Sequence, residues 1–387
     1  MELREDSILY SQNTPKSYLK NMGQFFTKAP IRDKLLSVLP KMDHPVILEP
    51  SFGTGEFLDS LLRIYKGDAH IVGIEKDKKL FQMVNKRIIG LDLRNQDFLT
   101  FDHKNKYDLV IGNPPYFEMS LTKDLDKRFG DVISGRPNIY SFFIKLGIEA
   151  LKPNGYLAFV LPASICSGAY FAALRSFIIA HTNIDYVEIF DDDNLFEKAS
   201  QRIILLVLRK TKNKGHNCFK FHEHNFITPE AKSLEQIFKG KQRLKDLGYR
   251  VKTGSIVWNQ KKDLLTNDNS HQFLLWAKNI DGGKIQVKNM ESPKGQYIKL
   301  KTSEPYPSIV VNRVIGNASA PEIRAAIQTK PFLAENHVNV IYPGQNPQVS
   351  LESIYEKLVS EEMREVVSML IGNTQLSKTE IEKILPF

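Results

Sequence analysis

Short apolar runs alternate with helix-like patterns along the first half of the chain. The apolar runs are bounded by polar or turn residues, as buried strands are, and cover residues 46–49, 71–75, 109–112, 156–161, 186–190 and 203–208. Between them, apolar residues recur at helical spacing over 56–65, 78–89, 140–151 and 170–181. Alternating strands and helices predict an α/β fold with a mostly parallel, doubly wound, Rossmann-like sheet. The ligands of such a sheet bind at the carboxyl ends of its strands.

This alternation breaks after about residue 210, where a polar stretch, Lys-Thr-Lys-Asn-Lys-Gly-His-Asn, begins. Beyond it the pattern indicates strands over 296–300, 308–315 and 337–342 and a final helix over 351–370. A chain of 387 residues is also too long for one ordinary core. We therefore expect a first domain over 1–215, a linker region over 216–245 and a mixed α+β domain over 246–387.

Composition and charge narrow the class of protein. A hydrophobic content of 42% with 25% charged residues is typical of a soluble globular protein, and no apolar stretch is long enough for a membrane span. The first residues lack the apolar region of a signal peptide, so we expect a cytoplasmic protein without membrane contact. Only Cys166 and Cys218 are present, which leaves no disulfide framework or zinc cluster, and we expect no metal. The net charge of +9 favours nucleic acid as a partner.

The most informative motif is Asn113-Pro114-Pro115-Tyr116, directly after the strand predicted over 109–112. Two successive prolines make a rigid corner whose carbonyl groups stay available as acceptors. The Asn113 side chain adds an acceptor, and Tyr116 or Phe117 offers an aromatic face for a flat heterocycle. The motif therefore predicts a site that holds a planar amine, although two prolines alone would indicate only a turn.

A glycine-containing loop follows the first predicted strand. Gly53 and Gly55 permit a tight turn and a close approach of a ligand to the backbone, and Glu75 ends the second strand 20 residues after Gly55. A carboxylate at that spacing accepts hydrogen bonds from ribose hydroxyls. Glu49 would repel the pyrophosphate of a dinucleotide but would attract an ammonium group. S-adenosylmethionine joins an ammonium group to a ribose, and we expect it to be the cofactor.

Other segments fit the same cofactor. Asp97 can accept from the adenine amine and Phe98 can pack on the ring, although Asp97 alone would be read as a turn residue. The segment before the first strand could close over the methionine end, although its two phenylalanines could also be a hydrophobic staple. The remaining predicted cofactor-binding residues are Gln24, Phe25, Phe26, Thr27, Ser51, Lys76, Asn113 and Pro115.

The order of these motifs resembles the gamma class of adenine-specific DNA methyltransferases, the Taq-like enzymes, over roughly residues 20 to 210. The resemblance implies a class I methyltransferase domain that uses S-adenosylmethionine, followed by a carboxyl-terminal domain that reads double-stranded DNA. Asn113, Pro114, Pro115 and Tyr116 would be the catalytic residues, and Phe196 matches the family's late aromatic that stacks on the target base. A cognate restriction endonuclease is a potential partner. Phe196, which lies shortly before a strand, is also the kind of residue that packs in a core.

Other functions must be weighed on the sequence. The Asn-Pro-Pro-Tyr motif also serves enzymes that methylate adenine in RNA or a glutamine amide, since both substrates present a planar nitrogen. A glutamine enzyme would not need a basic domain downstream. The chain could also be a non-catalytic nucleic-acid-binding module or the specificity subunit of a restriction complex.

Overall fold

The computed structural model describes residues 3–24, 26–190, 202–288, 290–291, 293–317, 320–370 and 375–387. It divides into two compact units, unit 1 (Met1–Lys232) and unit 2 (Ser233–Phe387). The division falls within helix α9 (Ala231–Phe238), inside the range predicted to be a linker. That range also contains the β9 strand (His224–Ile227) and the whole of its partner β8 (Cys218–Phe221).

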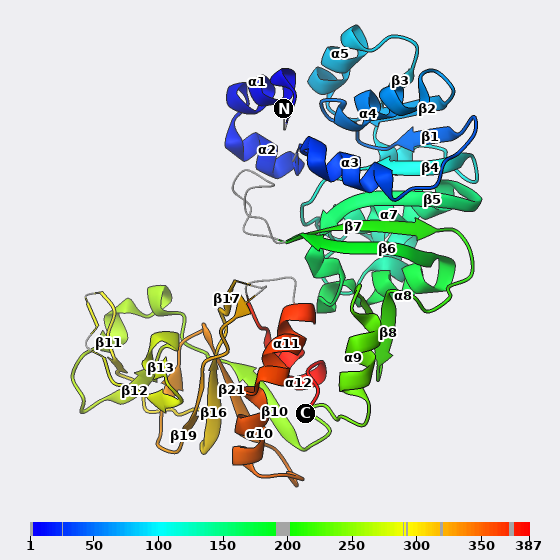
Figure 1. Ribbon diagram of the computed structural model, residues 1–387. Helices are drawn as coiled ribbons and strands as arrows, with labels where there is room; N and C mark the ends of the chain where they lie inside the picture. The colour runs from blue at the N-terminus through cyan, green and yellow to red at the C-terminus, as the bar shows by residue number, and fades with distance from the viewer. Residues whose placement is uncertain are drawn as a thin grey trace. The chain divides into compact units, whose positions relative to one another are not determined.

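Unit 1 is built around one seven-stranded sheet (Figure 1). In spatial order its strands are β3 (Asp92–Asn95), β2 (His70–Glu75), β1 (Val46–Glu49), β4 (Tyr107–Gly112), β5 (Leu151–Pro162), β7 (Ile203–Arg209) and β6 (Asn183–Phe190). Neighbouring strands are parallel from β3 to β5, whereas β7 is antiparallel to both β5 and β6. The predicted Rossmann-like, mostly parallel sheet is confirmed.

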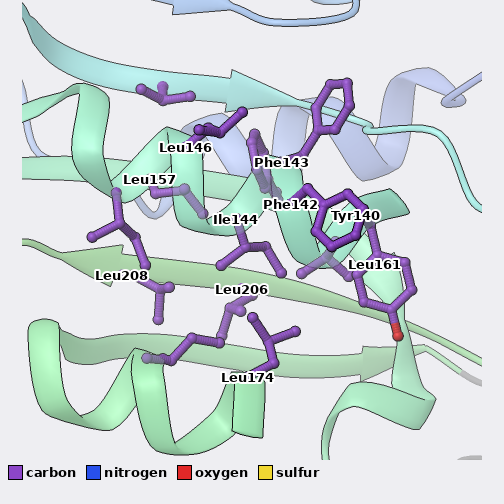
Figure 2. Packing of buried hydrophobic residues seen from close by; sticks show 14 of the residues in the cluster. Tyr140, Phe142, Phe143, Ile144, Leu146, Leu157, Leu161, Leu174, Leu206 and Leu208 are labelled. Carbon is purple, nitrogen blue, oxygen red and sulfur yellow. The ribbon is translucent and has the colours of Figure 1, made fainter. Parts of the chain in front are cut away.

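Helices cover both faces of this sheet. Successive strand residues point to opposite faces and so contribute alternately to two hydrophobic cores. Leu157, Leu206 and Leu208 face the helices α7 and α8, and Figure 2 shows this packing around Phe142 and Leu146. Alternate strand residues pack instead with α3, α4 and α5 in the second core. The helices of unit 1 are α1 (Glu5–Asn13), α2 (Lys16–Met22), α3 (Ala29–Ser37), α4 (Glu56–Tyr65), α5 (Lys78–Arg87), α6 (Lys123–Phe129), α7 (Ile139–Ala150) and α8 (Ala172–His181).

Unit 2 is a mixed α+β unit, as predicted, with small sheets and short helices. One four-stranded sheet has the order β10 (Tyr249–Thr253), β21 (Val338–Pro343), β16 (Ser308–Asn312) and β19 (Ala325–Gln328). A second has the order β11 (Leu265–Thr266), β15 (Tyr297–Ile298), β12 (Gln272–Leu275) and β20 (Leu333–Ala334). The remaining elements are the pairs β13 (Ile280–Asp281) with β14 (Lys284–Ile285) and β17 (Gly316–Asn317) with β18 (Ala320–Pro321), and the helix α12 (Lys378–Lys383).

The prediction of a single helix over 351–370 was wrong. The segment forms two helices, α10 (Leu351–Leu358) and α11 (Glu361–Leu370). Ser360 lies between them, and its hydroxyl accepts a hydrogen bond from the Met363 amide at 3.2 Å. This is the contact of an N-cap, so Ser360 starts a new helix where the apolar spacing alone predicted continuity.

Candidate active site

The carboxyl ends of β1, β2 and β4 meet at one pocket in unit 1. Most of the residues predicted to bind a cofactor line it, namely Gln24, Phe26, Thr27, Glu49, Ser51, Gly53, Glu75, Lys76, Asp97, Phe98, Asn113 and Pro115. Gly55, Pro114 and Tyr116 are not among its lining residues. Phe25 and Phe196 lie outside the described residues. The same pocket is therefore lined by residues of the glycine-containing loop and of the Asn-Pro-Pro-Tyr motif, which the sequence analysis treated separately.

The loop between β1 and α4 is held by its backbone. The Gly53 amide donates to a Glu75 carboxylate oxygen at 2.9 Å, and the Gly55 amide donates to the Phe52 carbonyl at 2.7 Å. Both glycines have positive φ, 57° and 83°. A Cβ at Gly55 would lie 2.8 Å from the Arg87 guanidinium and 3.2 Å from Val84. Arg87 is held in place by Asp59 and the Thr54 carbonyl, so a side chain at Gly55 would disturb the packing beneath the loop. Gly53 is the glycine that faces the pocket.

Glu49 is a buried carboxylate with an unfilled bonding position. Its side chain is 1% exposed, and its Oε2 atom has no hydrogen-bond partner. Burial, reinforced by the charges of Asp59 and Glu75, raises the pKa of Glu49 well above its ordinary value. A buried carboxylate without a donor is costly, and a cationic ligand group in the pocket would supply the missing partner.

Glu75 is already partly hydrogen-bonded. Its two oxygens accept from the Gly53 amide at 2.9 Å and from the Asp77 amide at 2.7 Å. Burial raises the pKa of Glu75 to about 7, and the backbone hydrogen bonds oppose that rise. Each carboxylate oxygen has more than one lone pair, so Glu75 retains capacity to accept from ligand hydroxyls.

The end of β3 supplies the other side of the pocket. Asp97 accepts from the Leu99 amide at 2.9 Å and pairs with the Lys76 ammonium at 2.8 Å. It thus serves as a turn residue while lining the pocket. Phe98 is buried, with its ring centroid 5.0 Å from that of Phe143. Phe143 also lines the pocket and widens its apolar wall.

The Asn-Pro-Pro-Tyr segment begins immediately after β4. The Tyr116 hydroxyl donates to the Asn113 side-chain oxygen, and it lies 2.6 Å from the Val160 carbonyl oxygen of β5. The Ser51 hydroxyl donates to the Asn113 carbonyl at 3.4 Å, which connects this segment to the glycine loop. Burial raises the pKa of Tyr116 well above its ordinary value, so its hydroxyl stays protonated and remains a donor.

The amino-terminal helices are tied to the pocket through Asp77, which the sequence analysis missed. Asp77 caps α5 by accepting from the Lys79 amide at 2.8 Å. Its other oxygen accepts from the Tyr10 hydroxyl of α1 at 3.3 Å and the Tyr18 hydroxyl of α2 at 3.0 Å. The Gln24 side-chain amide also donates to it at 3.2 Å. An acidic residue just before a predicted helix was the available signal for the cap, but not for these distant partners.

Other contacts fix the amino-terminal segment from both sides. The Ser7 hydroxyl donates to the Glu56 carboxylate at 2.5 Å, and its oxygen lies 2.9 Å from the Thr54 hydroxyl oxygen. A Cβ at Gly23 would lie 2.6 Å from the Tyr116 amide nitrogen, so the chain can approach the Asn-Pro-Pro-Tyr backbone only with glycine there. Gly23, which begins the segment expected to close over the methionine end, lines the pocket. The sequence analysis missed the pocket-lining residues Met22, Pro50, Phe52, Thr54, Glu56, Phe57, Gln96, Ile139 and Phe143. Most of them are apolar or belong to local turns, so no motif distinguishes them.

Comparison with known proteins bears directly on this site. Residues 62–196 match the model of the Eco57I restriction-modification methylase family. This segment is therefore similar to an Eco57I-type restriction-modification methylase domain. The fold of unit 1 is α/β with a mostly parallel, Rossmann-like sheet, as predicted. The cofactor expected for a methylase of this kind is S-adenosylmethionine.

Two curated relatives match this segment and the rest of the chain. The type II methyltransferase M.CvrRI of Paramecium bursaria Chlorella virus XZ-6E is 26% identical, with 100% of both chains covered. The modification methylase CviBIII of Paramecium bursaria Chlorella virus NC1A is 25% identical, covering 97% of this chain and 96% of its own. Among solved structures, the methyltransferase subunit of a type I restriction-modification system from Streptococcus thermophilus is 19% identical at a TM-score of 0.42, covering 58% of this chain and 55% of its own.

The pocket residues of unit 1 fit S-adenosylmethionine. The unpartnered oxygen of Glu49 suits the cofactor's ammonium group, and the remaining acceptor capacity of Glu75 suits ribose hydroxyls. Phe98 and Phe143 give an apolar wall for the adenine ring. Among the described residues, no group of three or more His, Cys, Asp and Glu side chains is placed to hold a metal ion. In the same part of the chain, no helix is long and apolar enough to span a membrane.

Proposed function

We propose that the chain is a sequence-specific DNA adenine methyltransferase. It transfers the methyl group of S-adenosylmethionine to the exocyclic 6-amino group of an adenine that is flipped out of the duplex. One observation carries this proposal: Asn113 and Pro115 line the same pocket as Glu49 and Glu75. A group held by the Asn-Pro-Pro-Tyr segment would therefore lie next to the cofactor.

The amine is activated by how it is held. Its two hydrogens are donated to the Asn113 side-chain oxygen and the Pro114 carbonyl, which favours a pyramidal nitrogen with its lone pair directed at the methyl group. The cofactor, when bound, supplies an electrophilic methyl on its sulfonium. Most of the catalysis is then positioning and electrostatic stabilisation by fixed acceptors.

The reaction needs no covalent nucleophile. Burial raises the pKa of the Cys166 thiol to about 12, so this side chain is not a thiolate near neutral pH. Burial also raises the pKa of Cys218. A thiol nucleophile such as cytosine-ring methylation requires is thus missing from the described pocket, whose lining contains neither cysteine.

The target base must leave the DNA stack, because its amine cannot be reached inside a duplex. We propose that the base stacks between Tyr116 and Phe196, which offsets part of the unpairing cost of a few kcal/mol. The Phe196→Ala variant should then bind a 2-aminopurine-containing duplex with a smaller fluorescence increase than the unaltered protein. An equal increase would exclude stacking by Phe196.

Double-stranded DNA is the partner that these features favour, read by unit 2, with a restriction endonuclease as a potential cognate partner. The names of the relatives, type II methyltransferase and modification methylase, support this assignment. Adenine in RNA is the second candidate, because the same amine-holding segment would serve it. A non-catalytic specificity subunit is less consistent with a pocket that keeps Asn113, Glu49 and Glu75 together.

The test is expression in a methylation-deficient bacterium, followed by long-read sequencing that detects modified adenine. The Asn113→Ala variant serves as the matched control, because it removes the amine acceptor and leaves Glu49 and Glu75 intact. We expect modified adenine at one short sequence with the unaltered chain and none with the variant. Unmodified DNA despite folded, cofactor-binding protein would favour RNA or a missing partner subunit.

A further inference from the structure

Two lysines in unit 2 cover the same tryptophan ring. The Lys294 ammonium lies 4.8 Å from the centroid of the Trp258 ring, and the Lys262 ammonium lies 5.6 Å from it. Lys294 is also 5.6 Å from the centroid of Trp276. We call Trp258, Lys262 and Lys294 the tryptophan–lysine surface.

Unlike the cations of unit 2 that form ion pairs, these two lysines have no carboxylate neighbour among the described residues. Lys252 pairs with Glu304 at 2.5 Å and Lys241 pairs with Glu362 at 3.4 Å. Within the described residues, neither Lys262 nor Lys294 has a carboxylate oxygen within 4.0 Å, and both side chains are exposed. Two cations placed near one ring repel each other, and an anionic partner would relieve that repulsion.

The surface is held rigidly from below. Trp258 packs against a small core that contains Ile256, Trp276 and Ile298. The Trp276 indole nitrogen donates to the Gly295 carbonyl at 3.0 Å, which fixes the backbone next to Lys294. A side chain at Gly295 would lie 2.4 Å from the Thr266 amide nitrogen, so this loop is packed directly against β11.

Gln296 completes this support. It is 1% exposed, and its side chain donates to the Leu274 carbonyl at 2.7 Å and accepts from the Asn279 side chain at 2.8 Å. A buried, hydrogen-bonded residue two positions after Lys294 leaves little freedom in the backbone that carries the lysine. The cations are therefore presented on a fixed platform.

We infer that the tryptophan–lysine surface binds the phosphate backbone of double-stranded DNA and helps to position unit 2 on its target. This rests on the proposed function and names the surface that performs part of it. Lysine ammonium groups without carboxylate partners attract phosphates, and the half-buried Trp258 ring beside them adds an apolar contact for the sugar edge. Phosphate contacts of this kind set orientation without carrying sequence information.

The chain offers a direct readout, because it contains only two tryptophans, Trp258 and Trp276, and both adjoin this surface. Adding duplex DNA to the protein saturated with S-adenosylhomocysteine should change the tryptophan emission. The Trp258→Phe variant, which keeps an aromatic ring in the core, should lose most of that change. An emission spectrum unaffected by saturating DNA would contradict the inference.

Affinity is tested with the Lys262→Gln and Lys294→Gln variants, alone and together, by fluorescence anisotropy of a labelled duplex over a range of salt concentrations. Each substitution should weaken binding about 3- to 10-fold at low salt and lower the salt slope by about one. The matched control is Arg364→Gln, which removes the same charge from unit 2 at a position where Glu361 pairs with the guanidinium at 2.8 Å. Control and unaltered protein should bind alike.

The outcomes separate this inference from the proposed function. If the double variant keeps the affinity and the salt slope of the unaltered protein while adenine methylation persists, the inference is wrong and the function stands. If the unaltered protein neither binds nor methylates DNA, the proposed function fails. Tighter binding of duplex RNA than of duplex DNA by the unaltered protein would overturn the assignment of the partner. Cofactor affinity should be the same in every variant, since these lysines lie outside the cofactor pocket.

Discussion

The Tyr116 hydroxyl donates a hydrogen bond to the side-chain oxygen of Asn113, the atom that would accept the target amine. The same hydroxyl lies 2.6 Å from the Val160 carbonyl of β5. Tyr116 therefore sets the orientation of the Asn113 amide from behind, against a rigid strand. The Asn113 oxygen has two lone pairs, so it can accept from Tyr116 and from the substrate amine together.

The Tyr116→Phe variant tests this orientation. It keeps the aromatic ring but removes the donor, so we expect turnover to fall about 10-fold, roughly one neutral hydrogen bond, with an unchanged cofactor dissociation constant. Asn113→Ala, measured beside it, should lose transfer entirely while still binding cofactor. Single-turnover kinetics with a fixed duplex would measure both. Wild-type turnover in Tyr116→Phe would mean that Asn113 is oriented by other contacts.

Asp77 links the amino-terminal helices to the cofactor pocket, and its removal should loosen them. Burial opposes ionisation of Asp77, but hydrogen bonds from the Lys79 amide and the Gln24 side chain outweigh it and lower the pKa. We expect Asp77→Ala to weaken cofactor binding about 10-fold and to speed proteolysis within residues 3–24. Loss of the α5 cap should also lower the free energy of unfolding by about 1 kcal/mol, whether or not the amino-terminal helices loosen.

A second cap variant separates these effects. Thr122 caps α6 by accepting from the Leu125 amide at 3.3 Å, and it does not line the cofactor pocket. Thr122→Ala should therefore lower stability by a similar amount without changing cofactor affinity or cleavage of the amino-terminal segment. Equal cofactor binding in Asp77→Ala and Thr122→Ala would show that Asp77 acts only as a helix cap.

Alanine substitutions at the two loop glycines, Gly53 and Gly55, should differ in their effects on the free energy of unfolding and on cofactor binding. Alanine at Gly55 meets the Arg87 guanidinium at 2.8 Å and adopts a left-handed φ of 83°, so we expect a loss of about 1–3 kcal/mol in the free energy of unfolding. Alanine at Gly53 meets only the Phe26 ring at 3.7 Å but projects into the ligand space. It should weaken cofactor binding more than it lowers stability.

A Gly67→Ala variant is the control for the cost of a left-handed φ without a packing contact. Gly67 has a φ of 92°, and nothing lies within 4 Å of an added Cβ. Gly67→Ala should cost only the left-handed penalty, about 1 kcal/mol. Urea unfolding and calorimetric titration of the three variants would measure stability and binding. Equal unfolding free energies for the alanines at positions 55 and 67 would contradict the packing role of Gly55.

The sequence predicted the sheet and the polar pocket residues because both depend on local signals. Glu49 and Glu75 each end an apolar strand, and parallel strands bring such ends together. Asp77 was missed because its partners Tyr10 and Tyr18 are 67 and 59 residues away, and no periodicity records such contacts. The two-residue strands of unit 2, such as β11 and β15, are too short for an alternating pattern to be recognised.

The acidic residues of the pocket also predict how stability depends on pH. Burial raises the pKa of Glu75 from 4.5 to about 7 and raises the pKa of Glu49 well above its ordinary value. The folded protein without cofactor therefore keeps protons that the unfolded chain releases from about pH 4.5 upward. The free energy of unfolding should accordingly fall as the pH rises from about 5 to 7, by up to roughly 3 kcal/mol from Glu75 alone.

Cofactor should reverse much of this loss, because an ammonium group beside Glu49 favours its charged form and so lowers its pKa. Urea unfolding at pH 5, 6, 7 and 8, with and without saturating S-adenosylmethionine, would measure both effects. The Glu49→Gln variant, which cannot ionise, should show a shallower pH dependence without cofactor and a weaker stabilisation by it at pH 8. If Glu49→Gln matched the unaltered protein in both respects, Glu49 would not be the group that receives the ammonium. The pH dependence left in that variant would belong to Glu75, whose hydrogen bonds from Gly53 and Asp77 are independent of the substitution.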